Sequence, residues 1–283
     1  MVNRHALLAG MGALFLVGCA AVQSVPLAEL RALPEGATAR FLYPSSGGKG
    51  EAYLVRPRGT GPFPLMVLLH GHSWTGVGAK RVLPAADIFA RELCFAGLAV
   101  SLPGYGDTKT SAGPLVETTR QVVLDAIATA KQLPWIDAKR LYVYGFSRGA
   151  VVAAGLISRI DDVKGALLHS GAYDLPRLYR ETSSFWLRQL LNPNGEAEPQ
   201  LYNVLPEVSR WPSSTLILHG AQDTLIPALQ ATLLRDQLQS LAKPHRLILF
   251  PEHGHWLPIR EIKEQAVQFL KENGGDGCYA TGP

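Results

Sequence analysis

The amino-acid sequence predicts an α/β fold in which a mostly parallel sheet is covered by helices on both faces. Three observations support this prediction. Strand-like apolar runs alternate with helical periodicity from residue 37 to 273. The run LMVLL at 65–69 is continuously apolar, as expected for a strand buried on both faces. The 283 residues are 47% apolar and 18% charged, which suits a globular domain with a large core and excludes a disordered chain.

The N-terminus has the pattern of an export signal. Arg4 precedes an apolar or glycine run at 6–17, which has the length of a signal-peptide core and is too short for a transmembrane helix. The run ends in LVGC at 16–19, which resembles the lipobox of bacterial lipoproteins. We therefore expect a lipoprotein signal peptide at 1–18 and a chain that begins at lipidated Cys19. An ordinary signal peptide with an incidental cysteine is the alternative.

Residues 19–36 are expected to form a tether, and the first half of the domain follows. Apolar and polar residues alternate at 37–43 and 51–56, which predicts paired strands, and PSSGG at 44–48 indicates the turn between them. After the strand at 65–69, the pattern predicts a helix around 79–96 and a strand at 98–102.

The second half continues the alternation until one irregular stretch. Residues 176–214 are rich in arginine, proline and aromatic residues and are too long for a plain connection, so we interpret them as an insertion in one domain spanning 37–273. Its aromatic side chains either cap the site or form a small core of the insertion; they are Tyr179, Phe185, Trp186 and Tyr202. A mobile tail is expected at 274–283. The remaining helices are expected at 116–133, 148–159, 228–241 and 259–271, and the strands at 141–144, 165–170, 215–219 and 246–250.

The pentapeptide GFSRG at 145–149 fits the G-x-S-x-G motif and lies between a predicted strand and a predicted helix. In that setting the glycines make room for a strained turn that exposes Ser147 as a nucleophile. The backbone amide of Arg148 would then face a developing oxyanion from the helix N-terminus.

A serine nucleophile needs a base and a group that orients the base. Asp223 follows one predicted strand, and His255 follows the next strand, in the order Ser147, Asp223, His255. These three residues are the expected triad. Asp174 is a rival acid and His253 a rival base.

The second oxyanion donor is expected in the HGHSW sequence at 70–74, after the strand at 65–69. The amide of His72 is the candidate donor, and His70 is expected to hold this loop by hydrogen bonds. A metal site on the two histidines is an alternative, although no Asp, Glu or Cys accompanies them at ligand spacing.

These residues together resemble the α/β-hydrolase superfamily over nearly all of 37–273, and most closely its branch similar to prolyl oligopeptidases and dienelactone hydrolases. The resemblance rests on GYGD at 104–107, on GFSRG at 145–149, on the loop around Asp223 and on the loop before His255. It implies an α/β-hydrolase fold with a small cap insertion. Oligopeptidases of this branch carry a propeller before the hydrolase domain, and dienelactone hydrolases use a cysteine nucleophile in place of Ser147.

The resemblance implies a serine hydrolase that cleaves a carboxylic ester or a small amide through an acyl-enzyme, with no metal or organic cofactor. One alternative is an oligopeptidase-like serine peptidase without a propeller, and another is a non-catalytic binding lipoprotein of the envelope. The expected partners are an ester or short peptide substrate and the membrane of the bacterial cell envelope, reached through Cys19. A net charge of +4 without a basic block gives no indication of nucleic-acid binding. Cys94 is expected to be buried as an apolar residue, and Cys278 to be free.

Overall fold

Nine strands form one mixed sheet in the computed structural model, which describes residues 22–110, 115–192 and 202–275. The strands are β1 (Gln23–Ser24), β2 (Thr38–Ser45), β3 (Gly48–Val55), β4 (Phe63–Leu69), β5 (Ala96–Ser101), β6 (Ile136–Phe146), β7 (Val163–His169), β8 (Ser214–Gly220) and β9 (His245–Phe250). The α-helices are α1 (Leu83–Leu93), α2 (Leu115–Lys131), α3 (Arg148–Ile157), α4 (Leu175–Glu181), α5 (Phe185–Leu191), α6 (Leu229–Ser240) and α7 (Ile259–Glu272). Three short 3-10 helices are η1 (Leu27–Ala32), η2 (Ala79–Arg81) and η4 (Leu205–Arg210).

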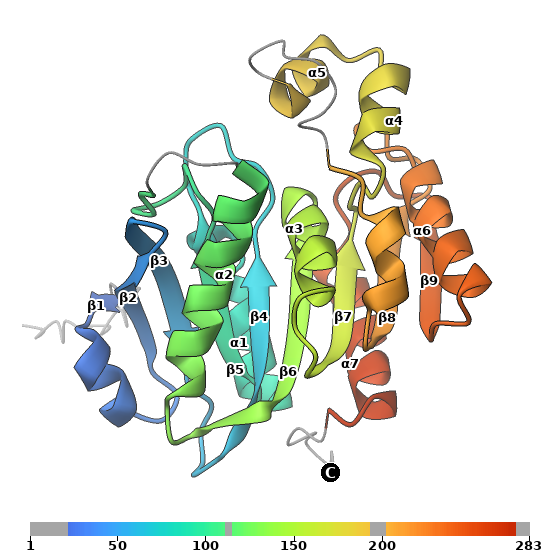
Figure 1. Ribbon diagram of the computed structural model, residues 1–283. Helices are drawn as coiled ribbons and strands as arrows, with labels where there is room; N and C mark the ends of the chain where they lie inside the picture. The colour runs from blue at the N-terminus through green and yellow to red at the C-terminus, as the bar shows by residue number, and fades with distance from the viewer. Residues whose placement is uncertain (1–21, 111–114, 193–201, 276–283) are drawn as a thin grey trace, which may run out of the picture.

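The sheet has the order β1-β2-β3-β5-β4-β6-β7-β8-β9. Strand β3 is antiparallel to both β2 and β5, and every other neighbouring pair is parallel. The parallel strands β4 and β6 to β9 therefore all end at the same edge of the sheet (Figure 1). The predicted mostly parallel sheet is confirmed.

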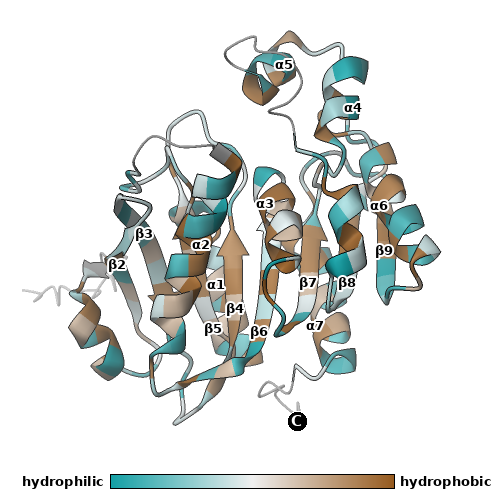
Figure 2. Cartoon of the chain, viewed as in Figure 1, coloured by the Kyte–Doolittle hydropathy of each residue, from teal (hydrophilic) through white to brown (hydrophobic). Residues whose placement is uncertain are grey.

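Helices cover both faces of the sheet (Figure 1). The residues of α2, α3 and α6 pack into one hydrophobic cluster, and those of α1 and α7 pack into a second cluster on the opposite face. The central strands are strongly apolar, whereas the helices carry polar residues toward solvent (Figure 2). This distribution is the one expected for strands that are buried twice and helices that are buried once.

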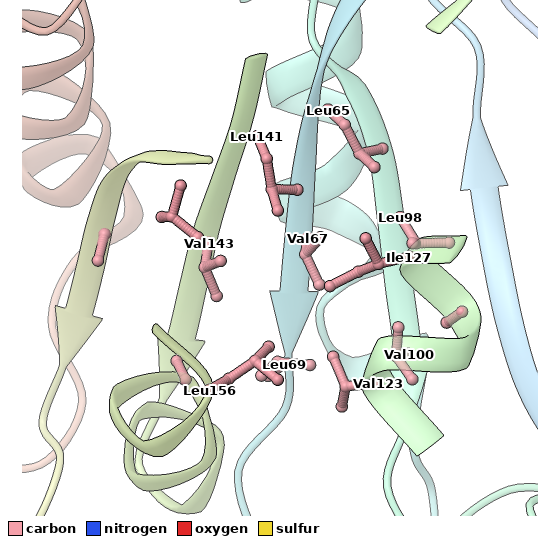
Figure 3. Packing of buried hydrophobic residues seen from close by; sticks show 14 of the residues in the cluster. Leu65, Val67, Leu69, Leu98, Val100, Val123, Ile127, Leu141, Val143 and Leu156 are labelled. Atoms are coloured by element: carbon pink, nitrogen blue, oxygen red, sulfur yellow. The ribbon is translucent and has the colours of Figure 1, made fainter. Parts of the chain in front are cut away.

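Strand β4 shows why its sequence lacks alternation. Leu65, Val67 and Leu69 point into the first cluster, where they meet the side chains of β5, β6, α2 and α3 (Figure 3). Met66 and Leu68 point into the second cluster. All seven residues of β4 are buried, so a charged residue at any of these positions would lack both water and a counter-ion.

The predicted helix around 79–96 is wrong at its C-terminal end. Helix α1 ends at Leu93, Cys94 caps it in the left-handed conformation with φ 54°, and Ala96 already belongs to β5. Cys94 is half-buried and disulfide-bonded, so its interpretation as a buried apolar residue is also wrong. Helical periodicity did not reveal this end because Phe95 and Ala96 continue the apolar pattern into the strand.

The segment expected as a tether is packed against the domain from residue 23 onward. Strand β1 pairs with β2, and Leu30 of η1 is 1% exposed. The turn between β2 and β3 is also shorter than predicted, because both strands extend until only Ser46 and Gly47 remain between them. Both residues have positive φ, as in the two-residue turns that match the twist of a hairpin.

The expected insertion contains helices α4 and α5 and the 3-10 helix η4. The stretch with α4 and α5 leaves and rejoins the domain at one place, where Asp174 and Asn203 form an antiparallel bridge. The 3-10 helix η4 follows this bridge, and its Val208 packs into the first hydrophobic cluster of the domain. Helices α4 and α5 lie beyond the ends of the parallel strands, above the edge where those strands end (Figure 1).

Two expectations fall outside the described ranges. The signal peptide with Cys19 belongs to residues 1–21, and most of the expected mobile tail belongs to residues 276–283. Within the described ranges, the helices are too short or too polar to cross a membrane.

Candidate active site

Ser147 occupies a strained turn between β6 and α3. Its φ of 54° and ψ of −119° are unusual for a residue with a side chain, and its amide is held by the carbonyl of His169 at 2.8 Å. The turn is possible because of the flanking glycines: a Cβ at Gly149 would lie 2.1 Å from the Leu69 carbonyl oxygen, and one at Gly145 would lie 2.4 Å from that of Gly149. The two glycines of the motif are therefore what allows Ser147 to occupy this sharp turn.

The structure brings Ser147, His255 and Asp223 together from three separate stretches of chain. The Oγ atom of Ser147 lies 3.0 Å from Nε2 of His255, and Nδ1 of His255 lies 2.7 Å from Oδ2 of Asp223. The carboxylate accepts the Nδ1 proton, which leaves Nε2 free to accept the proton of the serine hydroxyl. This arrangement can activate the serine as a nucleophile.

The carboxylate of Asp223 is fully buried and surrounded by donors. Its Oδ1 accepts the amides of Leu225 and Ile226 at 2.9 and 2.8 Å, and its Oδ2 accepts Nδ1 of His255. Nε2 of His219 donates to the Ile226 carbonyl at 2.8 Å and also lies 3.3 Å from Oδ2 of Asp223. Burial raises the pKa of Asp223, but hydrogen bonds from His219, His255 and the Ile226 amide outweigh it and hold the pKa well below its usual value. Asp223 therefore stays ionised.

The two rival residues lie elsewhere. The Nε2 atom of His253 lies 3.4 Å from Glu261 on α7. The carboxylate of Asp174 accepts the amide of Arg177 and so caps the N-terminus of α4. Among the described residues, the carboxylate that hydrogen bonds to His255 is that of Asp223.

The loop after β4 lies beside the serine. A Cβ at Gly71 would lie 3.1 Å from Cβ of Ser147, so the backbone of this loop passes close to the nucleophile. His70 holds the loop in place as expected: Nδ1 donates to the Gly71 carbonyl at 2.7 Å, and Nε2 accepts the amide of Leu102 at 3.0 Å. Burial lowers the pKa of His70 to about 4, so the ring is neutral near pH 7.

The side chain of His72 is held by a short chain of hydrogen bonds. Nη1 of Arg148 donates to Oη of Tyr105 at 3.3 Å, and this hydroxyl forms a hydrogen bond of 2.6 Å with Nδ1 of His72. Burial, with the charges of Arg148 and Arg81, lowers the pKa of His72. The amides of His72 and Arg148 have no hydrogen-bond partner within the described ranges, so both can donate to an oxyanion.

A cavity of about 530 Å³ opens beside Ser147. Its apolar wall is formed by side chains from α3, α4, α5 and the loop after β8, among them Val152, Leu178 and Leu187. Arg120 and Tyr202 lie at this wall, with the guanidinium 4.6 Å from the centre of the ring. A cavity of this size and polarity suits an apolar acyl group or side chain of a substrate.

Exposed aromatic side chains surround the entrance to the cavity. Trp74, Trp186 and Trp256 line it and are 74%, 68% and 63% exposed. Trp74 and Trp186 meet edge to face with their centres 6.3 Å apart. Of the aromatic residues singled out in the insertion, Trp186 and Tyr202 line the cavity.

Sequence reasoning assigned no role to His219, Tyr105 or the leucines of α4 and α5. His219 stands four residues before Asp223, at the end of a strand, and that spacing is the signal that could have identified it. Tyr105 lies in the quoted GYGD turn, but its partner His72 is 33 residues away in sequence. Only the folded chain shows that contact.

Comparisons with known proteins place this geometry in a family. A family model described as the prolyl oligopeptidase family matches residues 117–276, which is more than half of the chain. Dipeptidyl-peptidase 5 of Porphyromonas gingivalis is 25% identical over 167 residues, which are 55% of this chain and 24% of that protein.

Solved structures show the same fold. The acylaminoacyl peptidase of Pyrococcus horikoshii superposes with a TM-score of 0.70 at 16% identity, over 90% of this chain and 44% of that chain. The esterase Pf2001 of Pyrococcus furiosus superposes with a TM-score of 0.66 at 16% identity, over 86% of this chain and 93% of that chain. The chain therefore spans about a quarter of the peptidase relative and less than half of the acylaminoacyl peptidase.

Proposed function

The chain belongs to the prolyl oligopeptidase family of serine hydrolases, and from that premise we propose that it hydrolyses carboxylic esters or small amides with Ser147 as the nucleophile. One observation carries the proposal: His255 bridges Ser147 and the buried, ionised Asp223 with hydrogen bonds of 3.0 and 2.7 Å. A histidine placed between a strained serine and a buried carboxylate is typical of a catalytic triad and is not required by packing.

The first half of the reaction forms an acyl-enzyme. The Oγ atom of Ser147 attacks the carbonyl carbon while Nε2 of His255 takes the hydroxyl proton. Asp223 holds the ring in the required tautomer and stabilises the imidazolium that forms. The tetrahedral intermediate then collapses, the bond to the leaving group breaks, and the leaving group takes the proton from Nε2.

Water completes the cycle. A water molecule gives its proton to Nε2 of His255 and attacks the acyl carbon, and collapse of the second intermediate returns the proton to Oγ of Ser147. In both halves the amides of Arg148 and His72 donate to the oxyanion. Their support is the position of Arg148 at the first turn of α3 and the close approach of the 70–72 loop to Ser147.

The test uses the protein without residues 1–19, short and long 4-nitrophenyl esters, and a prolyl 4-nitroanilide. We expect ester turnover in the wild type, a loss of at least about a thousandfold in Ser147→Ala, and fluorophosphonate labelling of the wild type alone. His253→Ala is the matched control and should keep its activity within about twofold, because His253 contacts Glu261 rather than the serine. Equal rates in wild type and Ser147→Ala would support the binding-lipoprotein alternative instead.

A peptidase is the second candidate, because the relatives in the comparisons include a dipeptidyl-peptidase and an acylaminoacyl peptidase. The prolyl 4-nitroanilide separates the two candidates. Its hydrolysis at a rate comparable to that of the esters would favour the peptidase, since an anilide needs protonation of its leaving nitrogen by His255.

We also propose that the chain is exported and lipidated at Cys19. The support is the apolar run before LVGC at 16–19, together with the disulfide at Cys94, because disulfides persist in oxidising compartments. Expression in a bacterial host with a labelled fatty acid tests it. Wild type should carry the label in the membrane fraction and Cys19→Ser should not; an unlabelled wild type would refute the proposal.

A further inference from the structure

The lining of the cavity beside Ser147 combines apolar and basic side chains. Leucine and valine side chains of α3, α4 and α5 line it. All three charged residues that line the cavity are arginines, namely Arg81, Arg120 and Arg148. Each of these charges is met by a carboxylate of the protein, by water or by a substrate.

Arg120 is balanced by the protein. Its guanidinium forms ion pairs with Glu117 at 2.7 Å and with Glu207 at 3.3 Å. Its exposed fraction is 5%, so it is a buried and neutralised part of the wall. It offers no free charge to a substrate.

Arg81 and Arg148 have aromatic partners instead. The guanidinium of Arg81 lies 5.7 Å from the centre of the Trp256 ring, and that of Arg148 lies 5.5 Å from the centre of the Tyr105 ring. Within the described ranges, no carboxylate lies within ion-pair distance of either guanidinium. Both charges act on the same region, because both lower the pKa of His72. Among the described residues, the cavity that Ser147 lines therefore holds two guanidinium groups without a carboxylate partner.

Arg81 lies close to the place where the leaving group departs. His255 protonates the leaving group, so that group must lie near Nε2 of His255. Trp256 is the next residue, and the guanidinium of Arg81 lies over its ring. Arg148 lines the same cavity beside Tyr105. The leucines of α4 and α5 also line this cavity and suit an apolar acyl group.

We propose that the site takes an ester or amide whose acyl group is apolar and whose leaving group bears a carboxylate, which Arg81 and Arg148 bind. An N-acyl amino acid and the C-terminal end of a peptide with an apolar side chain before the scissile bond both have this chemistry. The proposal rests on the proposed function, because it assigns the two sides of the bond that Ser147 attacks. Guanidinium groups bind carboxylates in a planar, bidentate geometry that a neutral leaving group cannot match.

Two esters that differ in one carboxylate test the proposal. They are 4-nitrophenyl hexanoate and 3-carboxy-4-nitrophenyl hexanoate, which release coloured nitrophenolates from the same acyl group. We expect wild type to prefer the anionic ester by at least about tenfold in kcat/KM at low salt. The preference should shrink when the ionic strength rises to about 0.5 M, because salt screens charges at an exposed entrance.

Variants locate the effect. The ratio of the two kcat/KM values should fall severalfold in Arg81→Gln and approach one in Arg81→Gln/Arg148→Gln. Arg260→Gln is the matched control, since it removes the same charge from an exposed site on α7, and its ratio should equal that of wild type. Because the ratio compares two substrates on one enzyme, a general loss of activity does not affect it.

Failure of the carboxylate proposal can be distinguished from failure of the proposed function. If neither ester is hydrolysed in a Ser147-dependent way, the proposed function fails. If the neutral ester is hydrolysed through Ser147 but wild type shows a ratio of one or less, only the carboxylate proposal is overturned. A preference for the anionic ester that survives in Arg81→Gln/Arg148→Gln would also overturn it.

Discussion

At the scale of single residues, the site depends on glycines whose surroundings leave no room for a side chain. The turn around Ser147 brings the backbone of α3 against the end of β4, and the position of Gly149 leaves no room for a Cβ beside the Leu69 carbonyl. Glycine is therefore required at position 149 because two backbone segments approach closely there. A left-handed conformation is not the reason, since the φ of Gly149 is not positive. Ser147 is thereby held in a fixed turn while its side chain lines the cavity.

Gly149→Ala should lower the free energy of unfolding by about 3 kcal/mol and reduce ester turnover by more than about tenfold, because β4 or α3 must shift to admit the methyl group. Urea unfolding and kcat/KM measure the two effects. Gly76→Ala is the control: Gly76 has φ +70° but open space around its Cβ, so only a backbone cost of about 1 kcal/mol is expected. Equal losses in both variants would contradict the close-approach explanation.

At the scale of elements, the edge strands and the active-site loops are joined through Glu51 of β3. Its Oε1 accepts Nε of Arg40 at 2.6 Å, and its Oε2 accepts Oγ of Ser101 and the amide of Asp107 at 2.9 and 3.0 Å. Burial raises the pKa of Glu51, but these hydrogen bonds outweigh it and hold the pKa below its usual value. The 102–108 loop, which carries Tyr105, is thereby fixed to the sheet.

Glu51→Gln should lower the free energy of unfolding by about 2 kcal/mol, because Arg40 loses its buried carboxylate partner and keeps only the exposed Asp107. Thermal and urea unfolding measure the loss. Glu264→Gln removes an exposed carboxylate on α7 and should cost less than about 1 kcal/mol. A similar small cost in Glu51→Gln would show that the ion pair contributes little.

The helix α3 and the insertion together set the length of the cavity. Val152→Phe should reduce the ratio of kcat/KM for 4-nitrophenyl octanoate to that for the acetate by at least about tenfold, because the ring occupies the space of the acyl chain. Leu229→Phe, at an exposed position of α6, should leave the ratio at the wild-type value. An unchanged ratio in Val152→Phe would mean that the acyl chain does not use this cavity.

At the scale of the whole molecule, buried histidines make stability depend on pH. Burial lowers the pKa of His70 to about 4 and that of His169 to about 3, against 6.5 for an exposed histidine. Between pH 6.5 and about 4 the unfolded chain binds protons that the folded chain does not, so folding stability falls as the pH falls. Above pH 6.5 neither state binds them, and the stabilisation is complete.

The free energy of unfolding should therefore drop between pH 7 and pH 4.5 by about 3 kcal/mol for each of these two histidines. His169→Asn keeps a polar atom near the Tyr144 hydroxyl, which lies 2.9 Å from Nδ1 of His169. This variant should show a drop about 3 kcal/mol smaller than wild type in urea unfolding at the two pH values. The same drop in both proteins would rule out His169 as a source of the pH dependence.

Most of the fold could be predicted from the sequence because each central strand and helix carries its own periodicity. The end of α1 could not, since Cys94 stops the helix by adopting the left-handed conformation within an apolar run. The packing of 23–36 was also missed, because Leu30 is buried through contacts with distant strands. For the site, the G-x-S-x-G motif predicted Ser147 as the nucleophile. The ends of the predicted strands indicated the loops that carry Asp223 and His255. The hydrogen bond between Tyr105 and His72, and the charge balance of the arginines, depend on tertiary contacts.

The bridge between Asp174 and Asn203 has a consequence for how such a protein can change. On either side of it, the Leu175 amide donates to the Tyr202 carbonyl and the Val204 amide donates to the Tyr173 carbonyl, so the two stems of the insertion are fastened together. The triad residues all lie outside the stretch between these stems. The part of the cavity lining that comes from α4 and α5 can therefore vary in sequence without a change in the residues that perform the chemistry.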